Sequence, residues 1–363
     1  MKLAWKELKH DKARYVMVEA ILVLMVFMVL FLSGLANGLG RAVSAGIENA
    51  DAKYFAVNEN AENVITISSL EPAQVEELRA QATGNVATLD IQRMNLKTKD
   101  SDNKIDVTYF AIDPLSFLAP AITEGISLEE ADVENAIVLD DSFKDEGIAL
   151  NDEITDASTG ITMKVVGFTH DQYYGHSSIG FMSVDTYTAI RKEINPAYQL
   201  SYHAAAIQDG DVSAIKVDGV TISDKAAIIN KIPGYSAEQT TINMIVWVLV
   251  VISAAILGVF FYIITIQKQK QYGVLKAIGM KMSEISTMII GQVTLLACFG
   301  MVIANALVWG MSKVLPSGMP FYLEGKSAAV VSAAFMVIAI VSSLVSTRKV
   351  AKVDPIVTIG GNE

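Results

Sequence analysis

Residues 239–267, QTTINMIVWVLVVISAAILGVFFYIITIQ, form a run of 29 residues without any Asp, Glu, Lys or Arg. An α-helix needs about 20 mostly apolar residues to cross the hydrocarbon core of a bilayer, so this run is long enough to span it. Three further charge-free stretches cover residues 20–40, 285–312 and 327–347, with 21, 28 and 21 residues. The sequence therefore predicts a membrane protein with four transmembrane helices.

The four stretches are unevenly spaced, because about 200 polar residues separate the first from the second. Apolar and alternating runs within this insert predict one mixed α/β domain. Strands are expected at residues 63–68, 105–112, 136–140, 163–168, 179–184 and 202–207, and helices at 72–82, 185–193 and 223–232. The expected fold is one membrane helix, a large extracytoplasmic domain and three further membrane helices.

The charges are distributed asymmetrically, and this sets the expected orientation. Residues 39–241 hold 32 acidic and 14 basic side chains (−18), and the rest of the chain holds 7 and 14 (+7). Lys and Arg collect in cytoplasmic loops, so both termini are predicted to be cytoplasmic. The acidic domain is predicted to be extracellular, and its charge argues against nucleic acid as a partner. The single Cys298 excludes an intrachain disulfide.

The expected organisation follows from these patterns. It comprises a cytoplasmic amphipathic N-terminal helix (1–15), transmembrane helix 1 (16–40), the extracellular α/β domain (41–240), transmembrane helix 2 (241–267), a cytoplasmic coupling loop (268–284), transmembrane helix 3 (285–312), an extracellular loop (313–326), transmembrane helix 4 (327–347) and a cytoplasmic tail (348–363).

Two features concern packing and catalysis. Gly34 and Gly38 form a G-x-x-x-G pair, which allows close helix packing and suggests a packing or dimer face. No metal-binding or hydrolase motif is present, and Gly325-Lys326-Ser327 lacks the preceding glycine of a phosphate-binding loop. The chain is therefore predicted to be non-catalytic, without an intrinsic metal or cofactor.

The loop after the second span, KQKQYGVLKAIGM (268–280), predicts a short amphipathic helix that ends at Gly279. This segment resembles the coupling element of FtsX/MacB-type ABC permeases, and Val353-Asp-Pro-Ile356 resembles the tail of that family. The resemblance implies a homodimer driven by mechanotransmission, with two copies of a separate ATPase subunit that binds the ATP. It assigns contact with the ATPase to Tyr272, Gly273, Leu275, Lys276, Ala277, Ile278 and Gly279.

A narrower resemblance is spread over the chain. Lys2-Leu-Ala-Trp-Lys-Glu-Leu and the segments 33–40, 174–178, 235–239 and 319–323 resemble the heme efflux permeases of the HrtB type in Gram-positive bacteria. This resemblance implies a multi-pass protein of the cell membrane that removes excess heme from the bilayer, a detoxification function with heme as substrate.

Heme iron takes His, Tyr, Met or Cys ligands, so such side chains near the outer ends of the spans are of interest. Tyr174, His176, Tyr235 and Met244 are the candidates for the substrate path. The residue types alone equally allow a plainer interpretation, in which Tyr174-Gly-His176 is ordinary turn chemistry and Met244 is a packing residue. The resemblance favours substrate-path roles for Tyr174, His176 and Tyr235.

Two alternative functions remain open from the sequence. One is an FtsX-like regulator that switches extracellular cell-wall hydrolases through its outer domain. The other is a MacB-like exporter of antimicrobial peptides or lipoproteins, since an acidic domain can attract cationic peptides.

Overall fold

The computed structural model describes residues 12–99, 101–315 and 319–351 of the chain. The chain divides into two compact units. We call Leu39–Thr240 the sheet domain, and Met1–Gly38 together with Thr241–Glu363 the helical unit. Most of the predicted N-terminal helix and of the predicted cytoplasmic tail, including residues 353–356, lies outside the described residues.

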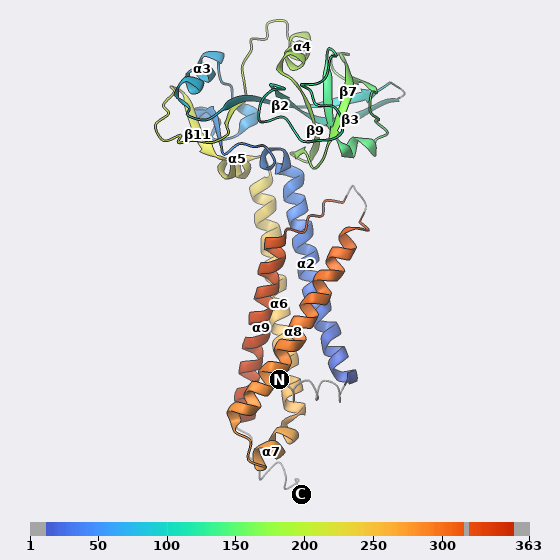
Figure 1. Ribbon diagram of the computed structural model, residues 1–363, viewed down its shortest axis with the longest axis vertical. Helices are drawn as coiled ribbons and strands as arrows, with labels where there is room; N and C mark the ends of the chain where they lie inside the picture. Colours follow the sequence, from blue (N-terminus) through green and yellow to red (C-terminus); the bar gives the residue numbers. More distant parts are fainter. Residues whose placement is uncertain (1–11, 100, 316–318, 352–363) are drawn as a thin grey trace. The chain divides into compact units, whose positions relative to one another are not determined.

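Four helices of the described chain are long and apolar enough to cross a membrane (Figure 1). They are α2 (Lys12–Glu48), α6 (Tyr235–Gln267), α8 (Met282–Ser312) and α9 (Gly325–Ala351). The short helix α7 (Gln269–Ala277) lies between α6 and α8 in the chain. The predicted order of one membrane helix, a domain and three further membrane helices is confirmed.

The four long helices share one apolar core in the helical unit, to which each contributes buried side chains. Examples are Val26 of α2, Leu257 of α6, Ala304 of α8 and Phe335 of α9. Only 17% of the most apolar window of α6 is buried, and Trp247 is 66% exposed. So much exposed apolar surface is unfavourable in water and suits contact with lipid.

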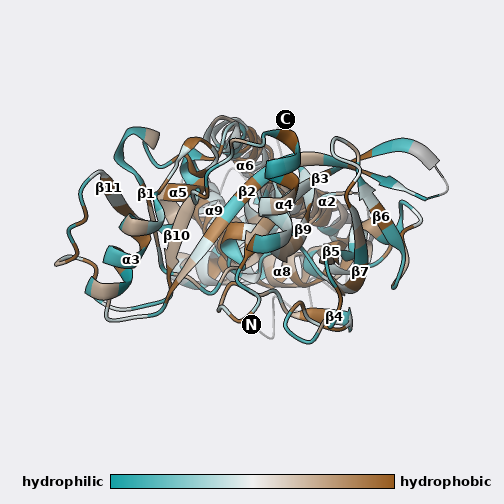
Figure 2. Cartoon of the chain, turned by 90° about the horizontal axis from the view of Figure 1, so that it is seen from above, coloured by the Kyte–Doolittle hydropathy of each residue, from teal (hydrophilic) through white to brown (hydrophobic). Residues whose placement is uncertain are grey.

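The sheet domain is built on a mixed β-sheet, which Figure 2 shows from above. Its path order is β11-β1-β10-β2-β3-β9-β5-β7-β4, with β6 paired to β2 and β7, and β8 paired to β9. The pairs β3–β9 and β5–β7 are parallel, and the other pairs are antiparallel. The strands are β1 (Tyr54–Asn58), β2 (Val86–Thr98), β3 (Ser101–Ile112), β4 (Ile122–Gly125), β5 (Ala136–Asp140), β6 (Glu153–Asp156), β7 (Thr162–Thr169), β8 (Tyr173–Tyr174), β9 (Ser177–Ser183), β10 (Ala204–Ile207) and β11 (Val220–Asp224).

The two faces of the sheet bury separate apolar cores, as the alternation of side chains along β3 illustrates. Tyr109 packs into one core, which Tyr187 of α4 (Val184–Ile194) also joins. Phe110 packs into the other core, together with Val43 and Ile47 from the end of α2. Burial of both faces explains why much of this sheet is apolar throughout rather than alternating with polar residues.

The ends of the shorter helices follow ordinary capping rules. The Ser183 hydroxyl accepts a hydrogen bond from the Thr186 N–H at the start of α4, and Asp224 caps α5 (Lys225–Lys231) in the same way. The helix α3 (Pro72–Gln81) begins with proline, whose missing N–H costs nothing at that position. Three 3₁₀ turns complete the domain: η1 (Glu59–Ala61), η2 (Ile65–Ile67) and η3 (Asp141–Lys144).

One local prediction differs from the structure. The strand expected at residues 63–68 is wrong, because Ile65–Ile67 forms a 3₁₀ turn in which Ile65 is buried and Ile67 is 70% exposed. Helix α2, which contains the predicted first span at residues 16–40, continues to Glu48. Residues 41–48 stay helical because Val43 and Ile47 pack into the core of the sheet domain.

Candidate functional site

The segment Tyr174-Gly-His-Ser177 forms the tight turn of a β-hairpin between β8 and β9. Tyr174 and Ser177 are paired across the hairpin, which leaves Gly175 and His176 as its two turn residues. Their φ angles are 57° and 63°, positive at both central positions as a type I′ turn requires. Residues other than glycine uncommonly adopt this left-handed conformation, and histidine is among those that tolerate it best.

The hairpin is attached to the C-terminal part of α2 through its backbone. The Gly175 N–H donates to the Val43 carbonyl at 3.0 Å, and the His176 N–H donates to the Ala42 carbonyl at 2.9 Å. Helix carbonyls can accept a second hydrogen bond because each oxygen has two lone pairs. The turn conformation therefore has two specific anchors on one helix.

The His176 imidazole reaches the first turn of α6. Its Nε2 lies 3.0 Å from Glu238 Oε1, and the two side chains are 44% and 36% exposed. The other carboxylate oxygen of Glu238 is buried and has no hydrogen-bond partner among the described residues. An acidic side chain is favourable at a helix N-terminus because of the helix dipole. Glu238 was not among the predicted site residues, although it directly precedes a charge-free stretch.

Tyr174 has a different environment from His176. It is 5% exposed and packs into the sheet-domain core, with its ring edge-on to Phe110 at a centroid distance of 5.7 Å. Burial raises the pKa of the Tyr174 hydroxyl well above its ordinary value. The neutral phenol is thus strongly favoured, and the side chain is placed to hold the hairpin on the core.

Tyr235 begins α6 and is half-buried against the same core. Its side chain lies near Ser44, whose Oγ lies 2.5 Å from Glu48 Oε1. The start of α6 and the end of α2 are therefore joined within the sheet domain by the Tyr235 and His176 contacts. Met244 belongs to the helical unit, where its side chain is 61% exposed.

A cluster of polar contacts around Arg41 lies beside the hairpin. Its Nε donates to Asp171 Oδ2 at 3.0 Å, and its other nitrogens reach Glu48 at 3.2 Å and Asn49 at 3.0 Å. The Asn49 amide in turn donates to the Asp171 carbonyl at 2.7 Å. We call Arg41, Glu48, Asn49 and Asp171 the arginine cluster. It was not predicted from the sequence, since Asp171 lies 122 or more residues away from the other three.

The strand ends next to the arginine cluster carry a group of titratable side chains. His170 Nδ1 lies 2.9 Å from Asp141 Oδ2, and this hydrogen bond raises the pKa of His170. Burial raises the pKa of Asp140, which accepts hydrogen bonds from the Ser142 and Gln172 N–H groups. Within the part of the chain that the structure describes, no cluster of His, Cys, Asp and Glu is suited to hold a metal ion.

The predicted coupling segment forms α7 and the turn after it. Tyr272 is 2% exposed and packs with Ile285, Met288 and Ile289 of α8. The opposite side presents apolar surface, since Val274 is 49% and Ile278 73% exposed. Of the remaining predicted residues, Gly273 is buried, Leu275 and Lys276 are partly buried, and Ala277 and Gly279 are exposed.

Gly279 ends this helix by taking up a φ of 99°. Its N–H donates to the Lys276 carbonyl, and the next N–H, of Met280, donates to the Leu275 carbonyl. Glycine is favoured there because a side chain would strain a left-handed residue. At the start of α7, the buried Lys268 donates to the Tyr15 hydroxyl at 2.6 Å, a contact that the sequence did not predict.

The glycine pair of α2 packs against another segment of its own chain. A Cβ atom at Gly34 would lie 2.5 Å from the Phe321 ring, and one at Gly38 would meet the backbone of Pro320. The Phe321 ring also stacks on Phe31 at 5.4 Å between centroids. The described structure thus gives the pair a packing role within the chain, and its role as a dimer face stays a prediction.

Comparison with known proteins identifies relatives along the whole chain. Residues 243–355 match the model of the FtsX-like permease C-terminal family. Two proteins, from Staphylococcus haemolyticus and Staphylococcus epidermidis, carry the name of a hemin transport system permease protein, HrtB. They are 29% and 30% identical to this chain over 363 and 365 residues, and each match covers 100% of both proteins.

Two solved structures also resemble part of the chain. The periplasmic region of MacB from Actinobacillus actinomycetemcomitans matches with a TM-score of 0.37 and 15% identity, covering 51% of this chain and 94% of that one. The extracellular domain of the ABC-type transporter YknZ from Gram-positive bacteria matches with a TM-score of 0.32 and 12% identity, covering 49% and 92%. The full-length sequence similarity and the FtsX-like segment together place the chain in the HrtB family of FtsX-like permeases.

Proposed function

We propose that this chain is the permease subunit of an ABC exporter that removes heme from the cell membrane and is driven by a separate ATPase subunit. The observation that carries this proposal is the similarity of the whole chain, at about 30% identity, to permeases named for hemin transport. We further propose a homodimer with two ATPase copies, with cytoplasmic termini and an extracellular sheet domain. The basic flanks and the acidic domain support this orientation.

The proposed contact with the ATPase is α7. Tyr272 anchors one side of this helix in an apolar cluster, and the exposed Val274 and Ile278 are available to a cytoplasmic partner. An anchored helix transmits force better than a loose loop, because displacement of α7 must also displace the residues of α8 packed against it. ATP binding by the partner would then shift the permease between two packing states. The shift in free energy between these states equals the difference in the partner's binding free energy to them.

The proposed substrate path includes His176, Tyr235, Tyr174 and Met244. His176 and Tyr235 are partly exposed and lie on segments joined by hydrogen bonds, so they are the stronger candidates for contact with heme. Tyr174 is buried, which favours a positioning role for it. Met244 offers an exposed thioether on a helix rich in apolar residues, where the flat apolar faces of heme can partition.

Optical titration of hemin into the full-length protein in detergent tests this proposal. Wild type is expected to give a saturable Soret shift, and His176→Ala and Tyr235→Phe are expected to weaken it at least threefold. Tyr174→Phe keeps the packed ring and serves as the matched control. A wild-type spectrum that is no different from hemin in empty detergent would contradict heme as substrate, and would direct attention to peptide export or hydrolase regulation.

A further inference from the structure

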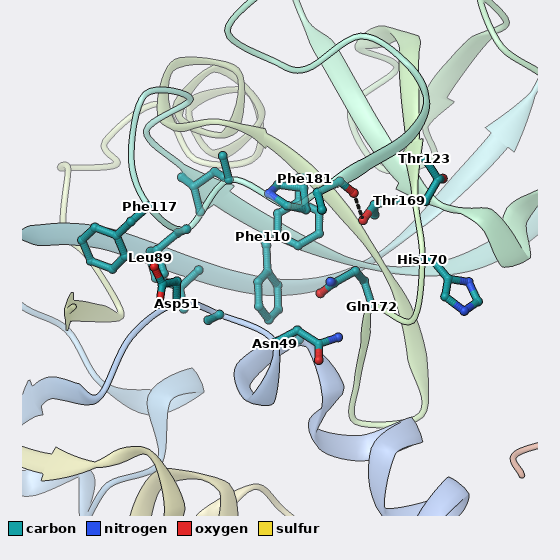
Figure 3. A pocket seen from close by; sticks show the side chains of 17 residues that line it. Asn49, Asp51, Leu89, Phe110, Phe117, Thr123, Thr169, His170, Gln172 and Phe181 are labelled. Carbon is teal, nitrogen blue, oxygen red and sulfur yellow. Dashed lines mark hydrogen bonds between the residues drawn. The ribbon is translucent and has the colours of Figure 1, made fainter. Parts of the chain in front are cut away.

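The sheet domain contains a cavity of about 380 Å³ that the heme-transport proposal does not use (Figure 3). This volume lies near the lower end of the range for small-molecule pockets, about 300–1,000 Å³. Its walls come from the end of α2, the β3–β4 connection and the neighbouring strands. The apolar lining includes Leu89, Phe110, Ile112, Phe117, Leu118 and Phe181.

One polar side chain in this cavity has no hydrogen-bond partner among the residues that the structure describes. Gln172 is 7% exposed, and its side-chain amide forms no hydrogen bond with any residue that the structure describes. Figure 3 shows the amide directed toward the side of the cavity where Phe110 and Asn49 lie. The amide atoms are not among the fully buried polar atoms without a partner, so they are open to the cavity, and a ligand that pairs with them would take the place of water.

The other polar side chains of the lining are already engaged. The Thr123 and Thr169 hydroxyls donate to the carbonyls of Phe168 and Ala121, at 3.0 and 2.8 Å. Asn49 is held in the arginine cluster, and Asp51 accepts a hydrogen bond from Gln208 at 2.7 Å. Among the amide and hydroxyl side chains of this lining, that of Gln172 is therefore the one without a hydrogen bond to the described residues.

The charges around the cavity restrict the ligand further. The lining described by the structure contains no Lys or Arg, and it includes the Asp51 carboxylate. His170 also lines the cavity, but its ring is paired with Asp141, which balances its charge when it is protonated. Nothing here compensates a buried carboxylate, so a dianion such as heme would be disfavoured.

We propose that this cavity binds an uncharged small molecule with an aromatic body and one carboxamide-like group that pairs with Gln172. A carboxamide both donates and accepts, so two such groups can form a pair of hydrogen bonds. The aromatic body would pack against Phe110, Phe117 and Phe181. Because Gly46 and Asn49 also line the cavity, the ligand would contact the C-terminal end of α2 and the turn after it.

Binding of three related probes to the full-length protein in detergent tests this site. Indole-3-acetamide carries the amide, 3-ethylindole lacks it, and indole-3-acetate replaces it with a charge. Wild type is expected to bind the amide saturably and about tenfold more tightly than the carboxylate. Gln172→Leu is expected to weaken the amide about five- to tenfold while leaving 3-ethylindole unchanged. Each probe partitions into the detergent micelle to the same extent with wild type and with the variant. The ratio of the two affinities for one probe is therefore independent of this partition.

Gln199→Leu removes an exposed amide from the same domain and is expected to bind all three probes like wild type. The proposal is overturned if wild type shows no saturable binding of indole-3-acetamide, if Gln172→Leu binds it with unchanged affinity, or if Gln172→Leu loses the amide and 3-ethylindole together. Hemin titration of Gln172→Leu is expected to match wild type, which separates failure of this site from failure of the heme proposal.

Discussion

The β8–β9 hairpin and helix α7 are both short segments with proposed functions, but different forces stabilise them. The hairpin is held by directional polar contacts: two backbone hydrogen bonds to α2, the His176–Glu238 contact and the adjacent arginine cluster. Helix α7 is packed mainly through one buried aromatic ring against apolar residues of α8. Directional contacts specify one conformation through their geometry, whereas close apolar packing makes neighbouring segments move together because the packed side chains interlock.

This difference has a functional interpretation. A substrate site benefits from fixed geometry, because its ligands must stay at defined positions. A segment that transmits motion from a partner benefits from close packing on the next helix, because the packed residues then move with it. The following predictions test the comparison, from the largest expected effect to the smallest.

The largest effect is expected for Tyr272→Ala, because it removes the buried ring that anchors α7. Deleting a buried aromatic side chain costs about 3–5 kcal/mol. Hydrogen exchange of the α7 amides is expected to accelerate strongly, while the amides of the hairpin exchange as in wild type. Tyr272→Phe keeps the ring and should preserve protection. Unchanged exchange in Tyr272→Ala would show that α7 does not depend on this packing.

A smaller effect is expected for Arg41→Met, which removes the cation of the arginine cluster. Its guanidinium bonds two carboxylates and is only 18% exposed, so its loss should cost about 2 kcal/mol. The melting temperature should fall, and exchange at residues 171–178 should rise without a change in α7. A double-mutant cycle with Asp171→Asn measures the coupling. If the stability changes of the two single variants add up to that of the double variant, the Arg41–Asp171 contact contributes nothing to the free energy of unfolding.

The turn conformation of His176 predicts a difference between two substitutions that both remove the imidazole. Asparagine tolerates a positive φ, so His176→Asn should change the free energy of unfolding by about 0.5 kcal/mol or less. A β-branched residue does not, so His176→Val should cost about 1–2 kcal/mol more. Chemical denaturation of both variants measures this difference. Equal stabilities would contradict the left-handed turn.

The smallest effect concerns pH and the hydrogen bond of His170 to Asp141. This bond raises the pKa of His170 in the folded state, so its stabilisation is fully present below the unfolded pKa of about 6.5 and disappears as the pH rises through the folded pKa. Because His170 is 71% exposed, only a few tenths of a kcal/mol are expected. The pH dependence of unfolding in wild type and in His170→Gln should differ in that window, and parallel profiles would exclude the contribution.

Several features could be predicted from the sequence because they depend on local composition. A long charge-free run must be helical in a bilayer, since each backbone polar group needs a partner there, and all four runs are helices in the structure. The end of α7 at Gly279 was predicted for a similar reason, because glycine readily takes up the left-handed conformation. The prediction of a strand at residues 63–68 was wrong because Ile65 and Ile67 both favour strands, but of these two side chains only Ile65 is buried.

The candidate site depended on contacts that sequence spacing does not reveal. Tyr174 and His176 are two residues apart, yet one packs into a core and the other reaches Glu238, which is 62 residues further along the chain. Arg41 and Asp171 are 130 residues apart. The Gln172 amide became a candidate for ligand binding only because the structure places it in the lining of a cavity.

The sequence by itself determined that this protein has four membrane helices, where the large domain is inserted and which segment has the pattern of a coupling element. These features follow from hydrophobicity, charge and glycine conformation, which act within a few residues of the chain. Only the tertiary structure decided that Val43 and Ile47 of α2 pack into the core of the sheet domain, that the glycine pair packs against Phe321 and that the Gln172 amide opens into a cavity. Each of these depends on which distant side chains the fold brings together, because burial and hydrogen bonding are properties of the packed chain.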